Sequence, residues 1–213
     1  MLRAIEKFAS SFPNEGMALH GTNLSRAAKI RLSGLHSREG NHVMAIPVFS
    51  VRELYASSKY ELLERLIGAA LWACHFAFQK SDAFASIGGS MPQEEPAVVI
   101  FRGNIDQQFR YSYDGSGFDT FERPKGENAP LFGEKIFPVA KYRTFGREIV
   151  FPMPPDTVLS VVSLSHQEML EIIALVNSLS LGQQTNFNIG YHFMGRLAKK
   201  TLSALVECTK AHF

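Results

Sequence analysis

The stretch "ALHGTNLSRAAKIRLSGL", residues 18–35, decides the fold because it joins an apolar run to a helical pattern at a His-Gly-Thr triplet. The residues "GMALHG", 16–21, have the pattern of a short strand, and positions 24–34 have the spacing of a helix. Thr22 or Asn23 provides the N-cap of this helix, and Gly34 ends it. The expected unit is a strand, a turn and a helix, with His20 at the end of the strand.

The rest of the chain adds strands first and helices last. Ser50 with Glu53 forms an S-x-x-E capping box, which predicts one long helix over residues 51–79. Ser165 with Glu168 forms a second box. Further strands are expected at residues 42–50, 97–105, 147–152 and 157–163, and further helices at 166–179 and 190–210.

This order of elements predicts an α+β chain. A length of 213 residues suits one domain, 1–213, with a core at about 17–163 and a C-terminal helical extension at 164–213. Hydrophobic residues make up 46% of the chain and charged residues 20%, which favours a packed interior over disorder. The net charge of +2 is too small to indicate a nucleic-acid or membrane partner by itself.

The sequence gives little sign of export, membrane insertion or metal binding. The most apolar run, residues 66–78, is too short to span a bilayer, and the N-terminus lacks a signal-peptide pattern. We therefore expect a cytoplasmic protein, or one delivered into a target cell by a non-classical route. Cys74 and Cys208 are far apart in the sequence and are expected to be buried free thiols. The seven histidines are scattered, so no metal site is expected.

Two residues stand where chemistry is plausible. His20 alone is most often a turn residue, but a histidine on a strand end is held firmly, and Gly21 lets the backbone approach a ligand. Glu148 begins an apolar strand, where an ionised carboxylate is costly unless it has a partner or a task. The plainer alternative for Glu148 is an exposed strand end, or an ion pair with Arg147 or Arg143.

Three windows together resemble a known family. "LHGTNLSRAAKIRLSGL", 19–35, resembles the first conserved region of ADP-ribosyltransferases of the His-Tyr-Glu type, the superfamily of poly(ADP-ribose) polymerases and diphthamide-modifying toxins. "GREIVFPMPPDTVLSVV", 146–162, is similar to the strand pair that carries the catalytic glutamate of that family. "VFSVRELYASSKY", 48–60, resembles the middle region, where a helix bears a tyrosine. The resemblance spans residues 17–163.

The resemblance implies a split β-sheet core with a long helix after the second strand, and NAD as co-substrate. In it His20 donates to a ribose hydroxyl, and the backbone of Gly21 holds the nicotinamide carboxamide. Glu148 accepts from the ribose 2′-hydroxyl and offsets the positive charge of an oxocarbenium-like transition state. A tyrosine stacks on the nicotinamide ring.

The assignment of the tyrosine and of two hydroxyl residues stays open. Tyr60 fits the A-x-x-x-Y pattern from Ala56 better than Tyr55 does, and either one is alternatively a helix-surface aromatic. Ser50 is either a site residue or only an N-cap. Thr22 is divided in the same way between capping and ribose contact.

The acceptor and the pyrophosphate contacts depend on basic residues. Arginine-specific relatives have Glu or Gln two residues before the catalytic glutamate, where this chain has Gly146, so arginine is disfavoured as acceptor. The segment 135–147 interleaves cations with aromatics, which suits a nucleic-acid acceptor, although a solvated basic face explains it equally well. Its candidate acceptor-binding residues are Lys141, Tyr142, Arg143 and Arg147. The candidates for the NAD pyrophosphate are Arg26, Arg31, Arg38 and Arg102.

The expected function is a toxin- or effector-like mono-ADP-ribosyltransferase, with a nucleic acid slightly favoured over a non-arginine protein side chain as acceptor. Such a role implies an antitoxin or immunity protein as a partner. The alternatives are an NAD glycohydrolase, in which water is the acceptor, and an inactive NAD- or ADP-ribose-binding module. A tRNA 2′-phosphotransferase shares the His-Gly-Thr triplet, but it should lack the glutamate that this chain has at position 148.

Overall fold

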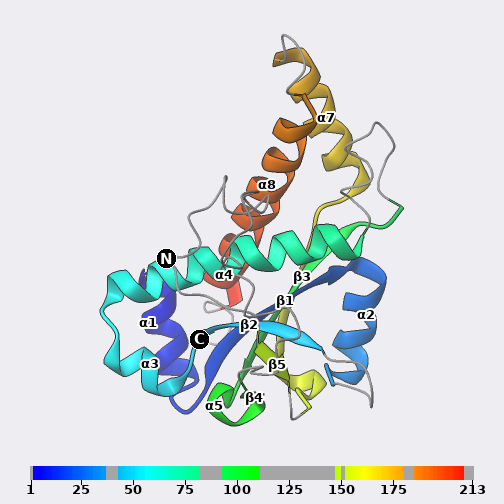
Figure 1. Ribbon diagram of the computed structural model, residues 1–213. Helices are drawn as coiled ribbons and strands as arrows, with labels where there is room; N and C mark the ends of the chain where they lie inside the picture. The colour runs from blue at the N-terminus through cyan, green and yellow to red at the C-terminus, as the bar shows by residue number, and fades with distance from the viewer. Residues whose placement is uncertain are drawn as a thin grey trace, which may run out of the picture.

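The computed structural model describes residues 2–36, 43–81, 93–110, 147–149, 152–179 and 185–208 (Figure 1). Its strands form one antiparallel sheet in the order β4-β5-β2-β1-β3-β6. The strands are β1 Gly16–Asn23, β2 Met44–Phe49, β3 Pro96–Gly103, β4 Phe109–Arg110, β5 Arg147–Ile149 and β6 Val158–Ser163. The helices are α1 Leu2–Ser11, α2 Leu24–Ser33, α3 Val51–Ala56, α4 Lys59–Lys80, α5 Ile105–Gln108, α7 His166–Leu179 and α8 Thr185–Cys208. The α+β class expected from the sequence is confirmed.

The central strand β1 is paired unequally with its two neighbours. It pairs with β3 along its whole length, from Gly16 opposite Gly103 to Asn23 opposite Pro96. With β2 it pairs only from Met17 to Leu19, and the register shifts within that short ladder. β2 in turn pairs with β5, so the part of the sheet formed by β4, β5 and β2 is joined to β1 by a short contact.

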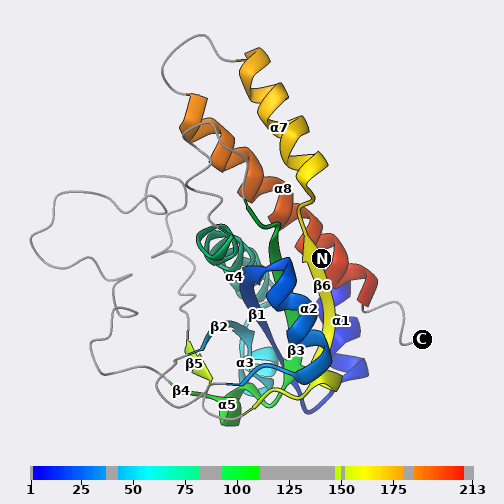
Figure 2. The same ribbon diagram turned by 90° about the vertical axis from the view of Figure 1, so that its right-hand side faces the viewer.

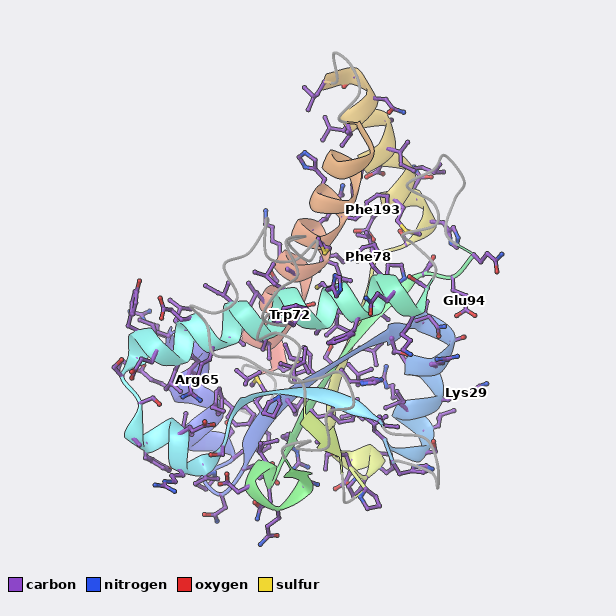
Figure 3. The ribbon with its side chains drawn as sticks, in the orientation of Figure 1. Lys29, Arg65, Trp72, Phe78, Glu94 and Phe193 are labelled. Atoms are coloured by element: carbon purple, nitrogen blue, oxygen red, sulfur yellow. The ribbon has the colours of Figure 1, made fainter. Side chains whose placement is uncertain are left out.

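Helices cover both faces of the sheet (Figure 2). On one face α4 and α8 pack together, and the rings of Phe78 and Phe193 stack between them with centroids 5.8 Å apart (Figure 3). On the other face Ala27 and Ile30 of α2 pack in a cluster with Ala18 of β1. The α7–α8 hairpin projects away from the sheet (Figure 1).

The caps of α2 follow the sequence closely. The side chain of Asn23 accepts a hydrogen bond from the Arg26 N–H at 2.9 Å, so Asn23 and not Thr22 is the N-cap. Gly34 ends the helix with φ of +78°, a conformation in which only glycine is unstrained, and its N–H donates to the Ile30 carbonyl at 2.8 Å. The expected strand and helix are confirmed, but no turn separates them, because β1 continues to Asn23 and His20 lies within the strand.

The single long helix expected over residues 51–79 is wrong, because the chain breaks into α3 and α4 at Ser57 and Ser58. Ser58 caps α4 in a second capping box with Glu61: the Ser58 N–H donates to the Glu61 carboxylate at 2.8 Å, and the Glu61 N–H donates to the Ser58 hydroxyl at 3.2 Å. Two boxes eight residues apart therefore start two helices.

The N-terminus forms a helix where the sequence analysis predicted no element, and the last helix starts earlier than expected. Residues 2–11 form α1, whose Phe8 is fully buried against Phe49, with ring centroids 5.5 Å apart. The last helix begins at Thr185 and not at 190. The helix over 166–179 is confirmed, together with its capping box, in which the Glu168 N–H donates to the Ser165 hydroxyl at 3.2 Å.

Both cysteines are free thiols, but only one is fully buried. Cys74 is completely enclosed, and this burial raises the pKa of its thiol despite a contact with Thr201 of α8. Cys208 is half-buried, and its thiol lies 3.6 Å from the Leu159 carbonyl oxygen. No helix in the described part of the chain is long and apolar enough to cross a membrane.

Helix α4 approaches the sheet very closely at Gly21. A Cβ built on Gly21 would overlap the carbonyl oxygen of Ala73 and lie 2.7 Å from the nitrogen of Ala77, both in α4. α4 meets β1 with small residues, and Ala69, Ala73 and Ala77 are fully buried there. The glycine of the His-Gly-Thr triplet is therefore required for the packing of α4 on β1.

We expect Gly21→Ala to destabilise the protein by about 1–3 kcal/mol, since overpacking against a helix backbone forces strand and helix apart. The matched control is Gly195→Ala in α8, where a built Cβ has no described atom within 4 Å. That substitution should stabilise the protein by about 0.5–1 kcal/mol through helix propensity. Urea unfolding followed by circular dichroism measures both, and equal effects of the two substitutions would contradict the proposed contact.

Candidate functional site

His20 is the fifth of the eight residues of β1 and is half-buried. Side chains alternate along a strand, and Gly21 faces α4, so His20 and Thr22 lie on the face of the sheet that α2 covers. Thr22 is only 2% exposed. Because Asn23 caps α2, the choice that the sequence left open for Thr22 is decided against capping.

The pairing of β1 with β2 stops where the His-Gly-Thr triplet begins, and the part of β1 beyond it, residues 20–23, borders what we call the β1–β2 opening. The β1–β2 ladder ends at Leu19 opposite Ile46, and from His20 to Asn23 the only described strand that pairs with β1 is β3. On the other side of this opening, Met44 and Ala45 of β2 pair with β5. Beyond Leu19 the edge of β1 that faces away from β3 therefore has no described strand partner, and Gly21, Thr22 and Asn23 are buried there.

Glu148 lies in β5, where its backbone pairs with Met44 on one side and Arg110 on the other. Leu19 of β1 pairs with Ile46 of β2, so Met44, two residues before Ile46, is level with Gly21, two residues after Leu19. Met44 pairs in turn with Glu148 of β5, so Glu148 is level with Gly21 two strands away. Two strand spacings correspond to roughly 10 Å. The side chains of Glu148 and Arg147 are outside the described part, as are Lys141, Tyr142 and Arg143 altogether.

The structure does not bring the candidate tyrosines to His20. Tyr55 in α3 and Tyr60 in α4 are 68% and 67% exposed. α4 crosses Gly21 at Ala73 and Ala77, near its C-terminal end, whereas Tyr60 is its second residue. At 1.5 Å per residue the separation along the helix axis is roughly 20 Å. Stacking of either tyrosine beside His20 is therefore not supported, because the orientation of α4 carries its first turn away from the triplet.

Ser50 is explained by helix capping. Its hydroxyl accepts from the Glu53 N–H at 3.3 Å, and the Glu53 carboxylate accepts from the Ser50 N–H at 2.9 Å. Ser50 is 3% exposed and lies beside Gly16, at the opposite end of β1 from His20. Its hydroxyl is therefore assigned to the cap and not to the candidate site.

The start of α2 is already occupied by protein groups. The Asn23 amide donates to the Lys80 carbonyl of α4 at 3.2 Å, so one side chain joins β1, α2 and α4. The Ser25 hydroxyl lies 3.1 Å from the Asn23 amide oxygen and 2.9 Å from the carboxylate of Glu94, which lies beside this end of α2 (Figure 3). A carboxylate at this helix N-terminus disfavours a pyrophosphate there.

Of the four arginines proposed to bind the NAD pyrophosphate, one lies beside the His-Gly-Thr triplet in the described part of the chain. Arg102 is committed elsewhere, because it donates to both oxygens of Glu15 at 2.6 and 2.8 Å, and its guanidinium stacks over Phe12 at 5.0 Å. Arg31 is in the last turn of α2, and Arg38 lies outside the described residues. Arg26 is exposed in the first turn of α2, three residues after Asn23.

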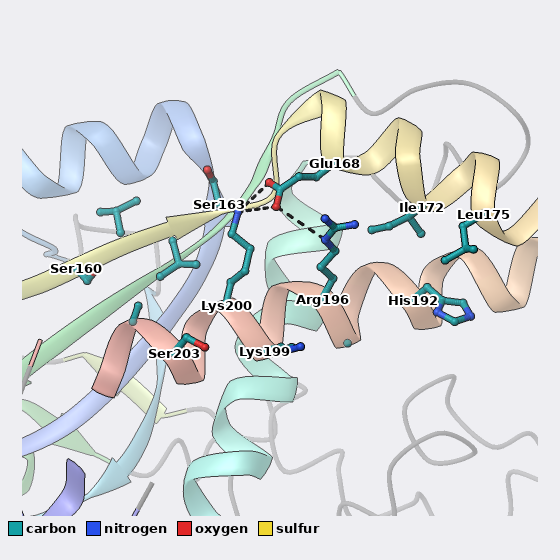
Figure 4. A pocket seen from close by; sticks show the side chains of 14 residues that line it. Ser160, Ser163, Glu168, Ile172, Leu175, His192, Arg196, Lys199, Lys200 and Ser203 are labelled. Carbon is teal, nitrogen blue, oxygen red and sulfur yellow. Dashed lines mark hydrogen bonds and ion pairs between the residues drawn. The ribbon is translucent and has the colours of Figure 1, made fainter. Parts of the chain in front are cut away.

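A concave region, which the sequence did not indicate, lies between β6, α7 and α8 (Figure 4). This groove of about 990 Å³ is far from the β1–β2 opening in strand order, since β1 and β3 separate β2 from β6. Within it Lys200 donates to the two oxygens of Glu168 at 2.9 and 2.8 Å. Burial by itself would raise the pKa of the Glu168 carboxyl. The hydrogen bonds from Lys200 and Ser165 outweigh burial, so the pKa lies below its ordinary value. The only sequence signal for this groove is the spacing of Arg196, Lys199 and Lys200 on one side of α8.

Among the described residues, no group of three or more His, Cys, Asp or Glu side chains could hold a metal ion. No family model, curated protein or solved structure matches this chain. The function is therefore inferred from the residues at the β1–β2 opening and in the groove.

We expect Asn23→Ala to destabilise the protein by about 1–2 kcal/mol, because it removes the cap of α2 and the hydrogen bond to Lys80 together. The matched control is Thr22→Val, which keeps the volume of the neighbouring side chain and leaves the cap intact. Thermal unfolding measures both variants. A larger loss for Thr22→Val than for Asn23→Ala would show that the cap is assigned to the wrong residue.

Proposed function

We propose that this protein transfers ADP-ribose from NAD to a macromolecular acceptor at the β1–β2 opening. One observation carries the proposal: the β1–β2 ladder ends one residue before His20, and the strand of Glu148 flanks β2 level with Gly21. The three sequence windows that resemble His-Tyr-Glu ADP-ribosyltransferases thus include neighbouring parts of one sheet, in the order β5, β2 and β1.

The edge of β1 beyond Leu19 suits nicotinamide. A strand edge presents N–H donors and C=O acceptors, and a carboxamide carries one group of each kind. Gly21 has no side chain, and α4 closes the side on which a Cβ would lie, so the carboxamide would approach in the plane of the sheet. The backbone of Gly21 would then hold the leaving group in a fixed orientation.

The remaining chemistry is assigned to His20 and Glu148. Bond breakage between C1′ of the ribose and the nicotinamide nitrogen leaves positive charge on the ribose, while nicotinamide departs with the bonding electrons. A carboxylate beside the ribose stabilises that charge more strongly in the transition state than in bound NAD, which accelerates the reaction. The acceptor then attacks C1′ and loses its proton. His20 fixes the ribose by donating to a hydroxyl.

The structure leads to two changes from the family pattern. Neither Tyr55 nor Tyr60 is assigned to the nicotinamide, since both are exposed and Tyr60 is roughly 20 Å along α4 from Gly21. No arginine is assigned to the NAD pyrophosphate, since Arg26, the one candidate described next to the triplet, shares the N-terminus of α2 with the carboxylate of Glu94. Thr22 remains a candidate for ribose contact.

Nucleic acid is our favoured acceptor, with a non-arginine protein side chain as the alternative. The support comes from sequence: residues 135–147 combine four cations with three aromatics and no acid, immediately before Glu148. Arg147, the last of these cations, begins β5. A toxin or effector of this kind would require an antitoxin or immunity protein as its partner.

The test follows label from adenylate-labelled NAD into a cell lysate. We expect Glu148→Gln to lower the transfer rate by about 100-fold or more, because a transition-state charge loses its counter-charge. The matched control is Asp106→Asn, an exposed carboxylate in α5, which should leave the rate unchanged. Product that resists protease and is degraded by nuclease identifies a nucleic-acid acceptor, and the reverse pattern identifies a protein.

Other outcomes would contradict the proposal. Release of nicotinamide without labelled product would indicate a glycohydrolase. Removal of a tRNA 2′-phosphate that does not depend on Glu148 would indicate a phosphotransferase. Binding of NAD without release of nicotinamide would indicate a binding module, and full activity of Glu148→Gln would exclude the assigned role of the glutamate.

A further inference from the structure

The groove between β6, α7 and α8 has three walls of different character (Figure 4). β6 contributes four consecutive residues, from Ser160 to Ser163. α7 contributes the apolar side chains of Ile172 and Leu175, of which Leu175 is 51% exposed. α8 contributes the cations, and its Ser203 lies toward the end of the groove that is nearer Ser160 (Figure 4).

The β6 wall is the edge of the sheet. β6 pairs with β3 on one side, and no other described strand pairs with it. Successive residues of a strand point to opposite faces, so a groove lined by four in a row reaches the strand edge and not only one face. Such an edge presents N–H and C=O groups to which an added extended segment can pair.

Gly195 gives an independent sign that something approaches α8 here. It is exposed in the interior of α8, lines the groove, and its built Cβ has no described atom within 4 Å. Glycine in a helix interior is unfavourable relative to alanine, and neighbouring packing explains it at Gly21 but not at this position. A ligand backbone that passes close to the helix would explain it.

The charges of the groove are predominantly positive. The α8 wall carries three cations, Arg196, Lys199 and Lys200. Two of them pair with carboxylates of α7, Lys200 with Glu168 and Arg196 with Glu171. Arg196 donates to Glu171 at 3.3 Å and lies 3.9 Å from Glu168. Lys199 is exposed and has no ion pair in the described part of the chain, so it is the cation available to an acidic ligand.

We propose that this groove binds an extended acidic segment of a partner protein, which pairs with the outer edge of β6 and places carboxylates against Lys199 and Arg196. Backbone hydrogen bonds along β6 fix its direction, and apolar residues alternating with the acids pack on Ile172 and Leu175. A peptide is favoured over a nucleic acid because the edge of β6 offers backbone pairing and α7 offers apolar contacts, which the evenly spaced phosphates of a nucleic acid do not use. This inference stands apart from the proposed NAD chemistry.

The experiment measures fluorescence anisotropy of a labelled ten-residue peptide that alternates Val and Glu. A peptide that alternates Val and Lys tests charge. The Val–Glu peptide methylated at alternate backbone nitrogens, in each of the two possible phases, tests strand pairing. We expect the unmethylated Val–Glu peptide to bind, the Val–Lys peptide not to bind, and one methylated phase to lose binding.

Variants locate the binding site. Gly195→Trp fills the groove and should weaken binding by about tenfold or more, and Lys199→Glu should weaken it by about fivefold. The matched control is Lys29→Glu, an exposed lysine of α2 that does not line the groove and lies on a helix covering the other face of the sheet from α8 (Figure 3), and it should bind as the wild type does. A melting temperature within a few degrees of wild type establishes that each variant is folded, and Lys199→Glu keeps the test valid should Gly195→Trp fail to fold.

The proposal is overturned by any of four results. These are absence of binding by the Val–Glu peptide, equal binding by the Val–Lys peptide, full binding by both methylated phases, and displacement of the peptide by single-stranded RNA that binds more tightly. Binding that survives both Gly195→Trp and Lys199→Glu would place the peptide elsewhere on the surface.

Discussion

The contact between β1 and α4 at Gly21 is the constraint on which the rest of the structure depends. Strand and helix backbones meet there without an intervening side chain, which requires glycine in β1 and the alanines of α4 opposite it. With α4 on this face, His20 and Thr22 must lie on the other, and a ligand of the Gly21 backbone must approach along the strand edge. The same glycine that the sequence suggests for ligand binding thus has a packing role first, and the two roles are compatible because they use different sides of the residue.

Local patterns predicted much of the local structure, and the misses that no local pattern could have avoided are those in which distant parts of the chain decide. The cap and stop of α2, the strands and the α7 capping box follow from residues within one turn of each other. The division of α3 from α4 was also readable, in the Ser58 and Glu61 box, but the continuous apolar face of residues 54–76 favoured one helix. The burial of α1 depends on Phe49, far along the chain, although the spacing of Ala4, Ile5 and Phe8 is itself that of an amphipathic helix.

The same distinction applies to the candidate site. The sequence identified His20, Gly21 and Glu148 by residue type, and their strands prove to be neighbours or next neighbours in the sheet. It could not place Tyr60, whose distance from Gly21 depends on where α4 crosses β1. The groove at β6 was also beyond sequence reasoning, because three elements separated along the chain form its walls. Since β1 and β3 lie between the opening and this groove, a partner bound at β6 leaves the β1–β2 opening uncovered.

The central claim is that NAD is held by the edge of β1 where β2 leaves it. Amide hydrogen exchange, resolved residue by residue by NMR with and without a non-hydrolysable NAD analogue, tests this most directly. The account predicts slower exchange at the amides of Gly21 to Asn23 when the analogue is added, with the amides of residues 160–163 in β6 unchanged. Unchanged exchange at residues 21–23, with protection appearing at β6 or nowhere, would contradict it.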